Sequence, residues 1–163
     1  MDRVEQDRVG QDRIGQDRLE QDRVGRAVGL MQEGKNCSMA VLAAFGERYG
    51  LDEETALRLG RPLGGGMGLM GLTCGAVSGG FLALGLAADQ DGAEADLRPE
   101  LYAKVRELAR RFEEMNGTIV CQELLGLDLN TEEGAAEAKA RNLIQTHCLR
   151  FVRETAEILD KMI

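Results

Sequence analysis

The chain has 163 residues, a net charge of −8 at neutral pH, and a hydrophobic share of 44% with few aromatic residues. This composition fits one globular domain with an aliphatic core. The negative charge argues against a nucleic-acid partner, because binding to phosphates needs a basic surface. No apolar run reaches the roughly 18 to 20 residues that cross a bilayer, so no membrane partner is expected.

Residues 1–25 are five consecutive pentads, MDRVE, QDRVG, QDRIG, QDRLE and QDRVG. A helix turns by about 100° per residue, so an apolar residue at every fifth position spreads around the helix and forms no apolar face. Strand alternation fails as well, because the period of five is odd. We interpret residues 1–25 as a low-complexity extension and residues 26–163 as a four-cysteine helical domain. The charged pentads also lack the apolar segment of a signal peptide.

Helical signals begin directly after the pentads. The helices predicted in the first half cover residues 27–31, 37–49, 53–59 and 71–88. Asn36 and Asp52 are typical N-caps for the second and third of them. The segment before the fourth helix, LGGGMGLMG, is rich in glycine and is predicted to be a loop.

A polar loop at 89–98 leads to the second half of the chain. Here the predicted helices cover residues 100–116, a short segment after Thr118, a segment after Asn130, and a final helix from about residue 146. Asn130 with Glu133 resembles a capping pair. Since no segment makes a convincing strand, we predict an all-α fold, a compact bundle of about six to seven helices with a Gly-rich loop.

The four cysteines are the strongest candidates for chemistry: Cys37, Cys74, Cys121 and Cys148. They form no C-x-x-C pair, which excludes the local signatures of zinc ribbons and thioredoxins. Each lies on the apolar stripe, or near the start, of a different predicted helix, and a bundle would turn these stripes toward one another. Thiolates gathered in this way suit a metal or iron–sulfur site, or one or two redox dithiols. A structural role as small buried hydrophobes remains open.

The glycines before Cys74 are predicted to contribute to cofactor binding: Gly65, Gly66, Gly68 and Gly71. Glycine lets the backbone approach a bulky group and can leave N–H groups free to bond it. Cys74 itself is predicted to open a helix, where the helix dipole would lower the thiol pKa. Cys74 is therefore the best candidate for a reactive or catalytic thiol. A flexible connector is the alternative reading of the loop, and its G-x-G-x-x-G spacing lacks the preceding strand of a dinucleotide site.

Four segments carry a family resemblance: NCSMAVLAAF, LGGGMGLMGLTCGAVSGG, VCQELLG and HCLRFVRETAEIL. Together they resemble the C_GCAxxG_C_C family of redox-active proteins, from about Ala27 to Leu159. The resemblance implies a small helical protein whose four family cysteines are the four named above. The family is similar to the iron–sulfur part of split-Soret cytochromes c, which favours a cluster. This chain reads Cys74-Gly75-Ala76 where the family label has Gly-Cys-Ala, and it lacks the C-x-x-C-H of covalent haem.

The leading functional prediction is a redox-active protein that binds an iron–sulfur cluster or another metal through these four cysteines, in electron transfer or redox sensing. A redox partner protein is expected, and the sequence leaves open an oxidoreductase activity and a homodimer. The alternative is a thiol–disulfide redox protein with Cys74 as the reactive thiol, and a purely structural interaction module is the third class. Because no signal peptide or membrane span is visible, a reducing cytoplasm is the expected location, where cysteines serve as thiols, ligands or catalytic dithiols more often than as structural disulfides.

Overall fold

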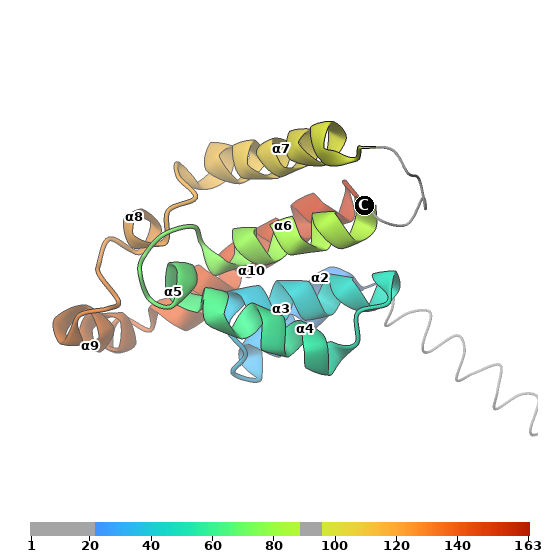
Figure 1. The fold of residues 1–163 in the computed structure, drawn as a ribbon. Coiled ribbons are helices and arrows are strands. Elements are labelled where there is room, and N and C mark those ends of the chain that lie inside the picture. The colour runs from blue at the N-terminus through green and yellow to red at the C-terminus, as the bar shows by residue number, and fades with distance from the viewer. Residues whose placement is uncertain (1–21, 89–95) are drawn as a thin grey trace, which may run out of the picture.

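A computed structural model describes residues 22–88 and 96–163, so the first four pentads, Gln21 and residues 89–95 of the loop predicted at 89–98 lie outside the described residues. Its helices are shown in Figure 1: α2 (Arg23–Gln32), α3 (Cys37–Gly46), α4 (Glu53–Gly60), α5 (Gly64–Met67), α6 (Gly75–Ala88), α7 (Arg98–Asn116), α8 (Cys121–Leu125), α9 (Glu132–Ala140) and α10 (Leu149–Asp160). Short 3-10 turns cover Glu47–Tyr49 and Arg61–Leu63, and a π-helical turn covers Ile144–Cys148. The predicted all-α class is confirmed.

Helix α3 lies at the centre of the bundle. It packs against α2, α4 and α6, while α10 packs against α2, α6 and α7. Figure 1 shows α7 on one side of the molecule and α4 on the other, with the remaining long helices between them. Every residue of α3 from Ser38 to Gly46 is buried. This helix is therefore enclosed by its neighbours on all sides, and not along one apolar stripe alone. None of the described helices combines the length and low polarity needed to cross a bilayer.

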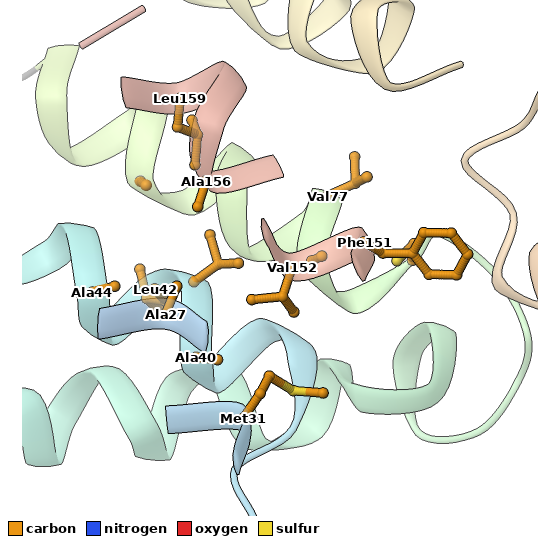
Figure 2. Packing of buried hydrophobic residues seen from close by; sticks show 14 of the residues in the cluster. Ala27, Met31, Ala40, Leu42, Ala44, Val77, Phe151, Val152, Ala156 and Leu159 are labelled. Atoms are coloured by element: carbon orange, nitrogen blue, oxygen red, sulfur yellow. The ribbon is translucent and has the colours of Figure 1, made fainter. Parts of the chain in front are cut away.

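The core is aliphatic, as the composition predicts. Figure 2 shows side chains from α2, α3, α6 and α10 meeting in one cluster, with Val152 near its middle. The largest buried rings are Phe45, Phe112 and Phe151, and the last two meet edge to face with their centroids 5.8 Å apart. Phe151 lies at the end of the core that faces α8 and the glycine loop, where the functional residues gather.

The predicted caps are partly confirmed. The Asn36 side chain accepts a hydrogen bond from the N–H of Met39 at 3.0 Å, and Asp52 caps α4 in the same way. The cap of α9 is Thr131 rather than Asn130, since the Thr131 hydroxyl accepts the N–H of Gly134 at 3.0 Å. Short polar side chains in adjacent positions have similar cap preferences, which makes a one-residue error easy.

Residues 22–25, the described part of the fifth pentad, belong to the folded bundle. Asp22 caps α2, which begins at Arg23, before the predicted domain start at residue 26. Arg23 is only 8% exposed. Its guanidinium donates to Asp160 at 2.9 Å and lies over the ring of Phe45, 5.0 Å from the centroid. The contact between Arg23 and Asp160 thus holds the start of α2 against the end of α10.

Glycines let the start of α3 fit tightly between α4 and α6. A Cβ atom on Gly60 would lie 2.8 Å from the Cα of Met39, and one on Gly79 would lie 2.9 Å from the carbonyl oxygen of Ser38. Real Cβ atoms do not approach backbone so closely, so any side chain at these positions would push the helices apart. This packing fixes the position of Cys37, the first residue of α3.

Candidate functional site

The four cysteines line one cavity of about 600 Å³. Cys74 and Cys121 are buried, with 3% and 7% of their surface exposed, whereas Cys37 and Cys148 are partly exposed. All four are free thiols. Residues more than a hundred positions apart in sequence therefore meet at one end of the bundle, as the helix pattern predicts.

Cys74 and Cys121 are brought together by a backbone pairing. Thr73 and Val120 form an isolated antiparallel bridge. The N–H of Cys74 donates to the carbonyl of Ile119 at 2.7 Å, and the N–H of Cys121 donates to the carbonyl of Leu72 at 2.6 Å. Neighbours of a bridged pair project to the opposite side from the pair itself, so both cysteines point to one side. The helix predicted to start at residue 71 begins at Gly75, because residues before it are extended and paired.

The glycine loop packs directly behind Cys121. Gly65, Gly66, Gly68 and Gly71 all have left-handed backbone angles, with φ between 60° and 70°. A Cβ on Gly66 would lie 2.7 Å from the Cβ of Cys121, so only glycine leaves room for this cysteine. Residues Gly65 and Gly68 line the cavity, whereas Gly66 and Gly71 press against Cys121 and its neighbour Gln122.

The prediction of free loop amides is wrong for two of these glycines. The N–H of Gly68 donates to the carbonyl of Gly64, and the N–H of Gly71 donates to the carbonyl of Gly65 at 3.2 Å. The loop uses these groups to hold its own left-handed shape. Gly68 and Gly71 both supply left-handed backbone, and Gly71 also allows the close approach of Gln122.

Cys37 and Cys148 also line the cavity, and their thiols lie close to each other. Cys37 begins α3, and a Cβ on Gly75 would lie 3.2 Å from the Cβ of Cys37. Cys148 ends the π-helical turn that precedes α10. In an α-helix, side chains five residues apart differ in direction by about 140°. A π-helical turn is wider, since its hydrogen bonds join residues five apart, so the directions of such side chains differ less. The turn therefore brings Cys148 nearer to the direction of Leu143, which is buried. The Cys37 and Cys148 thiols shift each other's pKa in opposite directions.

A family comparison agrees with this arrangement. The family model described as "Putative redox-active protein (C_GCAxxG_C_C)" matches residues 35–162. This chain belongs to the C_GCAxxG_C_C family. The match contains all four cysteines and leaves out the pentads. No curated protein and no solved structure matches the chain.

Protonation of the thiols in this C_GCAxxG_C_C protein follows their burial. Burial raises the pKa of Cys74 to about 12, although the N–H groups of Ala76 and Val77 at the start of α6 bond its sulfur and act in the opposite direction. The predicted lowering of the Cys74 pKa is therefore wrong, because desolvation outweighs the helix start. Burial also raises the pKa of Cys121 to about 11. The hydrogen bond from Cys37 lowers the pKa of Cys148, and the same bond raises that of Cys37.

The cavity walls are mainly apolar. Among the described residues, Lys35 and Arg61 are the charged members of the lining, which also includes the amides Asn36 and Gln145 and contains no histidine, aspartate or glutamate. His147 lies outside the cavity lining, where it contacts Thr146 and the ring of Phe151. Sulfur is therefore the only strong metal donor that the cavity offers.

The sequence carried a signal for the missed bridge. Thr118, Ile119 and Val120 are three consecutive β-branched residues, a composition typical of extended backbone. No signal pointed to Lys35 and Arg61, because their common position depends on α3 and α4 lying side by side.

Proposed function

We propose that the protein holds an iron–sulfur cluster, or another thiolate-bound metal, through Cys37, Cys74, Cys121 and Cys148, and that it works in electron transfer or redox sensing. The observation that carries this proposal is that four cysteines from four separate segments line one cavity. Thiolate is the usual ligand of iron–sulfur clusters. Membership in a family described as redox-active agrees with this chemistry.

The chemistry of the donors supports a thiolate-bound cluster, although it fits a thiolate-bound single ion as well. Among the residues in 22–88 and 96–163, no three His, Cys, Asp or Glu side chains form a group that could hold one metal ion. The ligands of a cluster stand further apart than those of one ion, because several irons and bridging sulfides lie between them. Among the residues that the structure describes, four thiols line one cavity that has no carboxylate or imidazole in its lining, so sulfur is the ligand that it offers.

The surrounding residues would tune such a site. A bound cluster would supply one-electron exchange. The N–H groups of Ala76 and Val77 would stabilise the Cys74 thiolate, and the positive charges of Lys35 and Arg61 would offset the negative charge of the ligand set. The apolar walls would restrict water, and solvent exposure is one of the factors that set a cluster potential.

One observation favours a second candidate, a thiol–disulfide protein. The thiols of Cys37 and Cys148 lie close enough to shift each other's pKa, and both residues are partly exposed. In this alternative they would form the redox pair, with Cys148 as the attacking thiol, in place of Cys74. Cys74 is a poor nucleophile because it is buried and its pKa is raised.

Purification without oxygen tests the proposal and separates the two candidates. The cluster predicts iron and acid-labile sulfide, with visible absorption that dithionite bleaches. Replacing any one of the four cysteines with serine should lower the iron content, and Ala83→Ser, a buried substitution that adds a hydroxyl outside the cavity, should not.

The Cys74→Ser variant is the most informative. If the protein is colourless, and a mild oxidant removes two free thiols in both the wild type and Cys74→Ser but not in Cys148→Ser, the dithiol candidate replaces the cluster. Circular dichroism of each variant shows whether a loss of iron reflects a loss of helical structure instead.

A further inference from the structure

The cavity has more room than the thiols alone require. Its volume of about 600 Å³ lies within the range of about 300 to 1,000 Å³ that is typical of pockets for small organic molecules. Cys74 and Cys121 are buried at its inner end, whereas Leu69 and Ile144 in its lining are 45% and 58% exposed. The cavity therefore extends from the sulfur atoms to an apolar rim at the surface.

The charges in the cavity are opposite in sign to the charge of the chain. The chain has 28 acidic and 20 basic residues, yet Lys35 and Arg61 are the only charged residues in the lining. In the part of the chain that the structure describes, neither of them forms an ion pair. Two cations near apolar walls attract an anion more strongly than they would in open solvent.

We propose that this cavity binds a small organic anion with an apolar body, held by Lys35 and Arg61 beside the four cysteines. The anionic group pairs with the two cations, and the body packs against the apolar side chains of the lining, among them Leu69, Leu129 and Ile144. The inference deepens the proposed function, on which its biological meaning rests, by naming the chemical class of molecule that a redox centre here would meet.

Equilibrium dialysis with a matched pair of probes tests the proposal. The anionic probe is 8-anilinonaphthalene-1-sulfonate, and the neutral control is N-phenyl-1-naphthylamine, which has the same aromatic body without the sulfonate. We expect one sulfonate probe to bind per chain, about tenfold more tightly than the neutral probe. The double variant Lys35→Gln/Arg61→Gln should lose this preference and keep the affinity for the neutral probe.

A second double variant controls for the overall charge. Arg106→Gln/Lys139→Gln removes two exposed cations outside the cavity lining and should leave both affinities unchanged. The inference is overturned if the sulfonate probe binds no better than the neutral one, or if the two double variants weaken it equally. It is also overturned if no small anion binds, in which case an acidic side chain of a partner protein would be the better occupant.

Iron content of the same samples distinguishes this inference from the proposed function. Anion preference in protein that never takes up iron would leave the inference standing while the cluster proposal fails. Iron-loaded protein that shows no preference for the anionic probe would overturn the inference and leave the cluster proposal standing. Circular dichroism confirms that the Lys35→Gln/Arg61→Gln protein remains helical, and the two single variants test each cation separately.

Discussion

Thr73, in the segment that joins α5 to α6, pairs with Val120, in the segment that joins α7 to α8. This antiparallel bridge sets the positions of two buried cysteines. Cys74 and Cys121 each follow one member of the pair, and the backbone N–H of each donates to the opposite segment. The pairing thus brings both cysteines into the lining of the same cavity.

The glycine loop gives the sharpest test of this geometry. Gly66→Ala would place a Cβ 2.7 Å from the Cβ of Cys121, and it also puts alanine at a φ of 69°. We expect Gly66→Ala to lower the iron content strongly and to reduce stability by more than about 1 to 2 kcal/mol, the cost of left-handed alanine alone.

Gly68→Ala is the matched control for this substitution. Its φ of 60° is similar, but the nearest atom to the new Cβ is 3.9 Å away. It should therefore reduce stability by about 1 to 2 kcal/mol and leave the iron content intact. Equal iron in the two purified variants would show that the loop does not position Cys121.

The N-cap residue of α3, Asn36, is expected to hold the start of the helix, and with it Cys37, in place. The Asn36 oxygen accepts the N–H of Met39 at 3.0 Å, and the Asn36 amide group donates to the carbonyl of Arg61 at 3.0 Å. Asn36→Ala loses both contacts and should reduce the free energy of unfolding by about 1 to 2 kcal/mol, measured with urea. Asn36→Asp keeps the cap acceptor, so a loss as large as that of alanine would contradict this role.

The contact between Arg23 and Asp160 should stabilise the whole bundle. Arg23→Ala removes a 2.9 Å ion pair and the packing over Phe45, and we expect a loss of about 2 kcal/mol in urea unfolding. Asp160→Ala should cost a similar amount, because it leaves the buried Arg23 guanidinium without its carboxylate. A double-mutant cycle gives the coupling between the two residues, and a coupling near zero would mean that only the packing of Arg23 contributes.

Much of this fold follows from local sequence signals. Asn36 and Asp52 begin helices because their side chains accept backbone N–H groups, a preference visible in the sequence alone. The mixed apolar and small residues of α3 show that the helix is buried, but not that it is surrounded on all sides. That burial depends on α2, α4 and α6 converging on it, which no local pattern records.

The sequence predicted that the four cysteines could gather in one place, but it did not predict the pKa of Cys74. The helical spacing of Cys37 and Cys148 places them on inward faces, and the structure agrees. The pKa of Cys74 was predicted with the wrong sign, because its burial, which only the folded chain reveals, outweighs the favourable helix start. The bridge between Thr73 and Val120 joins segments that are distant in sequence. The sequence signal for it was the run of β-branched residues that ends at Val120.

The thiols of the metal-free protein should react in a defined order. Cys148 has a lowered pKa and is partly exposed, so at pH 8 it should be alkylated first by iodoacetamide. Cys74 should react last, because with a pKa of about 12 only on the order of one molecule in ten thousand is thiolate at that pH. Raising the pH should increase the rate at Cys74 steeply. Mass spectrometry of timed digests gives the order, and early modification of Cys74 would contradict the structure.

Iron X-ray absorption of protein purified without oxygen tests the central claim most directly, because it reports the atoms bonded to the metal. A cluster held by Cys37, Cys74, Cys121 and Cys148 predicts sulfur alone around each iron, together with a short iron–iron distance. Protein that contains no iron, or iron surrounded by oxygen and nitrogen, would contradict the account.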